Sequence, residues 1–106
     1  MKFIIMYGCD SVGREWAAVD ANDYEEAYRY AEQSAIEYRA SFEGFHGILT
    51  FEEFCEENEN DDYEEAVNDF FEYIQNEIRY SVEEYDESNE DHQDVLFSEN
   101  GLFSKI

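Results

Sequence analysis

The chain has 106 residues, of which 43% are apolar, including nine Phe and nine Tyr, so it is long enough to bury a core and too aromatic for a disordered protein. Its 29 acidic residues against six Lys and Arg give a net charge of −23, and such a field repels nucleic acid and anionic membranes while it attracts basic surfaces. We therefore expect one soluble cytoplasmic domain over residues 1–106, with no direct binding to nucleic acid or membrane.

The N-terminal residues predict a β-hairpin. Lys2–Tyr7 is apolar and ends at Gly8, residues 9–13 contain turn-forming types, and Glu15–Val19 can return as the second strand. The first apolar run is too short to span a bilayer, and we expect no targeting segment.

A helix capped by Asn22 or Asp23 is predicted to run to about Ser41. Asp23 with Glu26 three residues later has the form of a capping box, and early acids suit the positive end of a helix. Residues at helical spacing form its expected buried face, namely Tyr24, Ala27, Tyr28, Ala31, Ala35, Tyr38 and Phe42. The ion pairs expected on its outer face, at a spacing of four residues, are Glu25–Arg29 and Arg39–Glu43.

Two more helices are predicted in the acidic half. Thr50 and Glu53 form a second capping box, which opens a short helix with Phe51, Phe54 and Cys55 on its apolar side. After an acidic linker over residues 56–61, a helix of about 24 residues, about 36 Å long, begins at Asp61 or Asp62. Its expected inner stripe is Tyr63, Ala66, Val67, Phe70, Ile74, Ile78, Val82 and Tyr85.

The C-terminal segment predicts a second hairpin. Residues 87–94 are polar and are expected to form a loop, and Asn100-Gly101 between two apolar runs is a strong hairpin-turn signal. The sequence therefore predicts an α+β fold, in which an antiparallel sheet from the two terminal hairpins packs against two longer helices and one short helix.

The pentapeptide DYEEA occurs at residues 23–27 and again at residues 62–66. The sequences that follow diverge at once, so we interpret the copies as two similar helix N-termini, each with its tyrosine on the buried side, rather than as an internal repeat. Their surroundings differ, because residues 1–49 hold nine acids and four bases whereas residues 50–106 hold twenty acids and two bases. Arginines partly neutralise the acids of the helix that follows the first copy, whereas the acids of the helix that follows the second copy are mostly not neutralised.

Residues that could hold a metal or carry catalysis lack the required spacing. The segments 58–63 and 86–91 have no glycine at the sixth position of a calcium loop. Cys9, His46, Cys55 and His92 show neither short zinc-ligand spacing nor a supported Cys–His pair, and the acids lie on polar faces rather than in a glycosidase pocket. We expect reduced cysteines, no metal, no cofactor and no enzymatic activity.

The acids of the long helix form a row. Successive members are about 5–6 Å apart, close to the phosphate spacing along one nucleic-acid strand, and 23 charges match roughly 39 Å of duplex. The candidate partner-binding residues on and around this row are Glu56, Glu57, Glu59, Asp61, Asp62, Glu64, Glu65, Asp69, Glu72, Tyr73, Glu83, Glu84, Asp86 and Glu87. The tyrosines expected to be partly exposed among the acids, as binding anchors or as the flank of the core, are Tyr30, Tyr73, Tyr80 and Tyr85.

The tyrosine-interleaved acidic segments EENENDDYEEAVNDFFEY (56–73) and VEEYDESNED (82–91) resemble small phage-type DNA mimics, such as the antirestriction proteins Ocr and ArdA and several anti-CRISPR proteins. The resemblance is to the class, covers mainly residues 52–94, and assigns no role to an individual residue. It implies a non-enzymatic inhibitor that blocks the nucleic-acid-binding groove of a basic host protein, a restriction enzyme or a CRISPR effector. An acidic interaction module such as an antitoxin or adaptor, a halophile-type soluble protein, and a homodimer stay open as alternatives.

Overall fold

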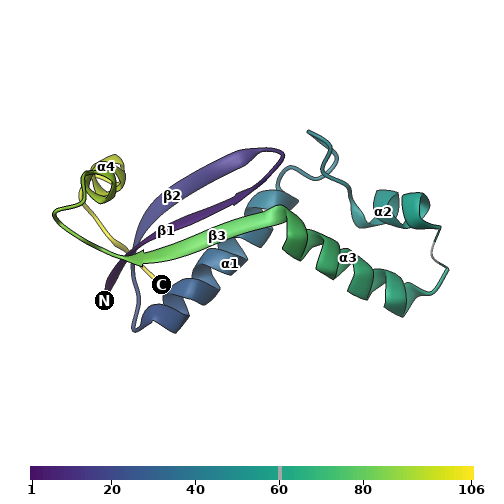
Figure 1. The fold of residues 1–106 in the computed structure, drawn as a ribbon, viewed down its shortest axis with the longest axis horizontal. Coiled ribbons are helices and arrows are strands. Elements are labelled where there is room, and N and C mark those ends of the chain that lie inside the picture. The colour runs from purple at the N-terminus through teal and green to yellow at the C-terminus, as the bar shows by residue number, and fades with distance from the viewer. Residues whose placement is uncertain (60) are drawn as a thin grey trace.

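The computed structural model describes residues 1–59 and 61–106, and its fold is α+β, as predicted (Figure 1). The chain forms, in order, β1 (Lys2–Cys9), β2 (Gly13–Asp20), α1 (Tyr24–Ala40), α2 (Phe51–Asn58), α3 (Tyr63–Glu77), β3 (Ile78–Glu84), α4 (Glu90–Ser98) and β4 (Ser104–Lys105). The strands of the described residues form one sheet in the order β3-β1-β2-β4. β1 is antiparallel to β2 and β3, but β4 is parallel to β2, so the sheet is mixed and not wholly antiparallel.

The predicted N-terminal hairpin is confirmed. β1 and β2 pair from Lys2 opposite Asp20 at the open end to Cys9 opposite Gly13 at the turn. Gly8 is required beside the turn, because a Cβ at this position would lie 2.2 Å from the carbonyl oxygen of Gly13. Since side chains alternate along a strand, this register fixes which β1 residues face each side of the sheet.

One face of the sheet packs against α1. Phe3 and Ile5 of β1 and Val19 of β2 form a buried cluster with Ala27 and Ala31 of α1. The small alanine side chains let the helix lie close to the sheet, so the core of the protein sits between these two layers.

Two tyrosines of α1 lie at the edge of this core, although they were predicted to be buried. Tyr24 is 53% exposed and meets the ring of Phe3 edge-on, with 6.2 Å between the centroids. Tyr28 is 41% exposed, and its hydroxyl donates to the Tyr80 hydroxyl at 3.4 Å. Because the alanines bring α1 close to the sheet, the larger side chains beside them are displaced towards solvent.

Helix α4 covers one end of the opposite sheet face. Ile4, Ala18 and Glu83 are cross-strand neighbours on this face, and the first two are buried. The buried His92 of α4 places Nε2 2.7 Å from the Glu83 carboxylate, while its Nδ1 accepts a hydrogen bond from the N–H of Asp86. Because Nδ1 is an acceptor, the neutral ring carries its proton on Nε2 and donates it to Glu83.

The long acidic helix is shorter than predicted. α3 begins after Asp62 as expected, but it ends at Glu77 and continues directly into β3. Ile78, Tyr80 and Val82 fit either assignment, since the first and last are four residues apart and all three recur at a spacing of two. Pairing with β1 favours the strand. It satisfies the hydrogen-bonding groups of the backbone along β3 and places Tyr80 and Val82 against the core beneath α1.

The C-terminal hairpin prediction is wrong, and the predicted loop is largely helical. Asn100 and Gly101 end α4 rather than turn a hairpin, with φ values of 60° and 75°. The N–H of Gly101 donates to the carbonyl of Leu96 at 2.9 Å and that of Asn100 to Phe97 at 3.0 Å, which is the Schellman pattern. A positive φ suits both a type I′ turn and a helix end, so the dipeptide alone did not distinguish them.

α2 and α3 lie side by side beyond the end of the sheet, at the right of Figure 1, in a molecule with principal extents of 52, 26 and 17 Å. Phe51 and Phe54 of α2 pack against Phe70 of α3, with ring centroids 5.3 and 5.2 Å apart. α2 continues through Asn58, so the start of the predicted linker is helical, and Asn60 within it lies outside the described residues. We call residues 50–59 and 61–77 the arm, and the sheet with α1 and α4 the body.

Candidate acidic interface

The arm carries many acids and no base. Its sequence contains twelve Asp and Glu residues and no Lys, Arg or His. Glu77, at the base of the arm, is half-buried. The other eleven acids are exposed, and they are Glu52, Glu53, Glu56, Glu57, Glu59, Asp61, Asp62, Glu64, Glu65, Asp69 and Glu72.

Capping lets two such acidic helices form. The Thr50 hydroxyl accepts from the N–H of Glu53, and the Glu53 carboxylate accepts from the N–H of Thr50, both at 3.2 Å, so the predicted capping box is confirmed. The Asp62 carboxylate accepts from the N–H groups of Glu64 and Glu65. Acids in the first turns also suit the helix dipole, but neither last turn contains a base of its own.

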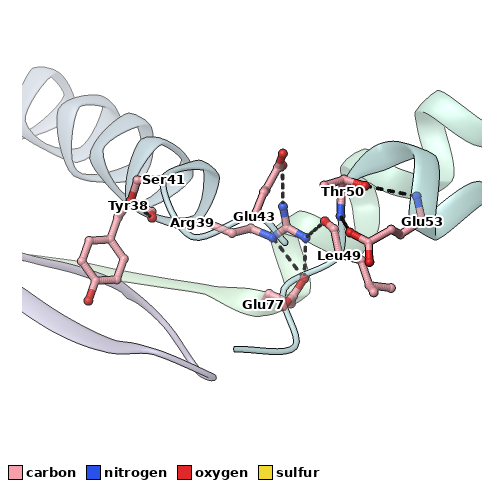
Figure 2. Close-up of polar contacts among 8 residues, drawn as sticks. All are labelled: Tyr38, Arg39, Ser41, Glu43, Leu49, Thr50, Glu53 and Glu77. Carbon is pink, nitrogen blue, oxygen red and sulfur yellow. Dashed lines mark hydrogen bonds and ion pairs between the residues drawn. The ribbon is translucent and has the colours of Figure 1, made fainter. Parts of the chain in front are cut away.

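A buried arginine of the body holds the base of the arm (Figure 2). Arg39, near the end of α1, is 1% exposed. Its Nε and Nη2 donate to the Glu77 carboxylate at 3.1 and 2.9 Å, Nη1 donates to Glu43 at 3.0 Å, and Nη2 donates to the Leu49 carbonyl at 3.0 Å. The predicted pair with Glu43 is present, but Arg39 is buried and not on an outer face. It joins α1, the segment before α2 and the last residue of α3.

The same guanidinium lies over two rings of α3, 5.3 Å from the centroid of Phe70 and 5.7 Å from that of Tyr73. Tyr73 also packs on Phe54, with 5.2 Å between centroids. Burial raises the pKa of the Tyr73 phenol above its ordinary value, and the nearby Glu77 carboxylate adds to the rise. The structure therefore places this candidate anchor in the packed aromatic side of the arm.

Four candidate residues do not lie on the arm. Glu83 and Glu84 are at the far end of β3, and Asp86 and Glu87 follow it. β3 leads away from α3 over roughly 23 Å, at 3.3 Å per residue, so the predicted continuous helical row is wrong. The acids form two separate groups. In the second group, hydrogen bonds from the hydroxyl and N–H of Ser88 hold the pKa of Asp86 below its ordinary value.

The other candidate tyrosines belong to the body. Tyr30 is 40% exposed. Tyr80 is half-buried and donates its hydroxyl proton to Glu32 at 2.8 Å. Tyr85 is also half-buried and meets Phe103 edge-on, with 5.1 Å between centroids. Of these three, Tyr30 has the side chain most open to a partner.

Sequence reasoning missed an exposed apolar surface on α3. Tyr63 and Val67 were predicted to face inwards, yet they are 73% and 40% exposed, and Phe71 is 58% exposed. No local sequence signal marked these residues. α2 packs along the neighbouring side of α3, where its rings meet Phe70 and Tyr73, and leaves this side uncovered.

Among the described residues, no group of three or more His, Cys, Asp and Glu side chains is arranged to hold a metal ion, and no helix combines the length and apolarity needed to cross a membrane. Cys9 is buried and Cys55 half-buried, both as free thiols. Comparisons of the chain with protein-family models, with curated proteins and with solved structures found no significant match.

Proposed function

We propose that the protein is a non-enzymatic acidic inhibitor, whose arm takes the place of nucleic-acid phosphates in the binding groove of a basic host defence enzyme, a restriction enzyme or a CRISPR effector. The observation that supports this most is the set of eleven exposed acids on a projecting arm that contains no base. The inhibitor acts by occupying the groove and carries out no chemistry.

The charge density of the arm supports the proposal. Over the length of α3, about 22 Å, a DNA duplex carries roughly 13 phosphate charges. The arm carries eleven exposed acids, a comparable number. A negative field of this strength also accelerates encounter with a basic groove, and salt weakens that effect.

The absence of Lys, Arg and His from the sequence of the arm supports the proposal as well. Two like charges 6 Å apart repel by about 0.7 kcal/mol in water, before screening by salt. Lysines at a spacing of four would remove this cost, and α1 does place Arg29 beside Glu25, with 3.8 Å between the charged groups. An arm that needed only solubility would gain from the same arrangement.

Charge reversal on the arm tests the proposal. The variant Glu65→Lys/Glu72→Lys is compared with Glu25→Lys/Glu37→Lys on α1, and both pairs raise the net charge by the same four units. DNA cleavage by a purified type I restriction enzyme and by a Cas9–guide RNA complex is measured against inhibitor concentration.

We expect wild-type protein to inhibit one of these enzymes stoichiometrically. The arm variant should lose about tenfold or more in potency, because removing close charge pairs at an interface commonly costs over 1.4 kcal/mol, and the α1 variant should lose little. The proposal would be contradicted if wild-type protein inhibited neither enzyme. Equal losses of inhibitory potency in the two variants would also contradict it.

A further inference from the structure

α3 presents an apolar stripe to solvent. Tyr63, Val67 and Phe71 are 73%, 40% and 58% exposed. Because they are four residues apart, they lie along one side of the helix over about 12 Å. We call these three residues the open stripe.

The packing of the arm explains why the open stripe is uncovered. α2 contacts the neighbouring side of α3, where the ring of Phe70 meets those of Phe51 and Phe54. Tyr63 meets only the edge of Phe51, with 5.9 Å between centroids. Among the ring contacts of the described residues, Phe71 takes part in none.

One acidic side chain of α3 borders the open stripe. Glu64 is three residues before Val67 and seven before Phe71, so it lies along one margin of the stripe. Glu65 and Glu72 are exposed on the far side of the helix. The surface is therefore an apolar ridge with negative charge beside it.

Area and charge both argue against a second copy as the occupant of the stripe. Given full areas of 150–250 Å² for aromatic side chains, the three residues expose roughly 350 Å². A stable interface buries about 800 Å² on each partner. Two copies would also bring together net charges of −23 each, which attraction over so small an apolar area does not offset.

We infer that the open stripe binds an amphipathic basic helix of a partner protein. Apolar side chains of that helix would pack over Val67 and Phe71, and its Lys and Arg side chains would meet Glu64 and be attracted by the net charge of −23. Charge attraction supplements the small apolar area in this arrangement. The inference rests on the proposed function only in taking the partner to be basic.

Two synthetic peptides provide the probe. One is a helix-forming peptide of about 18 residues, which is long enough for measurable helicity in water. It has Leu along one face and Lys at the other positions. The other keeps every Lys and replaces each Leu with Ser. Binding of each labelled peptide to the full-length protein is measured by fluorescence anisotropy at constant salt.

The Leu/Lys peptide is expected to bind about tenfold or more tightly than the Ser/Lys peptide. Phe71→Ser should remove about that tenfold difference, because loss of a central aromatic anchor commonly costs this much. The matched control is Phe97→Ser on α4, since Phe97 is 86% exposed and outside the arm. Urea unfolding confirms that each variant is folded.

Equal binding of the two peptides, an unchanged affinity in Phe71→Ser, or an equal loss in Phe97→Ser would overturn the inference. So would sedimentation showing a wild-type dimer that Phe71→Ser converts to a monomer, because a second copy would then cover the stripe. The proposed function fails separately. If wild type inhibits DNA cleavage but binds the two peptides equally, the inhibitor stands and this inference falls, whereas preferential binding of the Leu/Lys peptide without enzyme inhibition leaves this inference standing alone.

Discussion

Replacing Arg39 with methionine removes the guanidinium that joins the arm to the body and keeps a side chain of similar length. The variant loses four hydrogen bonds, two to Glu77, one to Glu43 and one to the Leu49 carbonyl. It also leaves the Glu77 carboxylate, whose side chain is 15% exposed, without a cation.

The size of the effect follows from this burial. Removing one partner of a fully buried ion pair costs about 3–5 kcal/mol, because the other charge stays buried and unpaired. Glu77 and Glu43 keep 15% and 31% of their side-chain surface, so water can partly solvate both carboxylates once Arg39 is gone. We therefore expect Arg39→Met to lower the free energy of unfolding by about 2–4 kcal/mol, below the fully buried case.

Urea unfolding monitored by circular dichroism measures this loss. Arg29→Met is the matched control on the same helix, because Arg29 is 70% exposed and 3.8 Å from Glu25, and we expect a loss of about 0.5 kcal/mol or less. The double variant Arg39→Met/Glu77→Gln removes the unpaired carboxylate and should recover about 1 kcal/mol or more. Hydrogen exchange should rise in residues 61–77 of Arg39→Met.

Equal losses in Arg39→Met and Arg29→Met would refute this reasoning, since the buried and the exposed arginine would then contribute alike. A double variant no more stable than Arg39→Met would show that an unpaired Glu77 is not the source of the loss.

Other properties follow from the same structure. Screening of the crowded acids should raise the melting temperature by roughly 5–10 °C between about 20 mM and about 300 mM NaCl, and a flat or falling temperature would contradict the crowding. The hydrogen bond with Tyr28 raises the pKa of Tyr80 well above its ordinary value, and burial and Glu32 add to the rise, so the protonated phenol stabilises the fold. This contribution is fully present below the unfolded-state pKa of about 10 and is lost as pH rises towards the folded-state pKa. The difference in unfolding free energy between wild type and Tyr80→Phe, measured by urea titration, should therefore shrink above about pH 10. Gly101→Ala should cost about 1 kcal/mol of unfolding free energy, because φ is 75° and no neighbouring atom lies within 4 Å of a Cβ there, and no loss would contradict the helix end described for α4.

The starts of α1, α2 and α3 could be predicted from sequence because they are set locally. Asp23, Thr50 and Asp62 each accept a hydrogen bond from an N–H two or three residues later in the chain, so the short motif contains all the atoms involved. The end of α3 is not local. Ile78 and Val82 fit helix and strand alike, and their pairing with Cys9 and Ile5 of β1, 69 and 77 residues earlier in sequence, decides between the two.

The candidate site divides in the same way. The exposure of the arm acids was predictable, since isolated carboxylates rarely stay buried. The burial of Arg39 was not, because it requires Glu77, 38 residues away in the chain, to approach it. Nor could the sequence show that α2 leaves Val67 and Phe71 uncovered, which depends on how the two helices are placed against each other.

Competition between duplex DNA and this protein tests most directly whether the arm occupies a phosphate-binding groove. Fluorescently labelled duplex is bound to whichever enzyme the inhibition assay identifies as the target, at constant ionic strength, and its release is followed by anisotropy as unlabelled protein is added. Mutually exclusive binding predicts complete release, with the midpoint shifting about tenfold for a tenfold rise in DNA once DNA saturates the enzyme. A ternary complex, in which labelled DNA stays bound while the protein saturates the enzyme, would contradict the proposed mimicry.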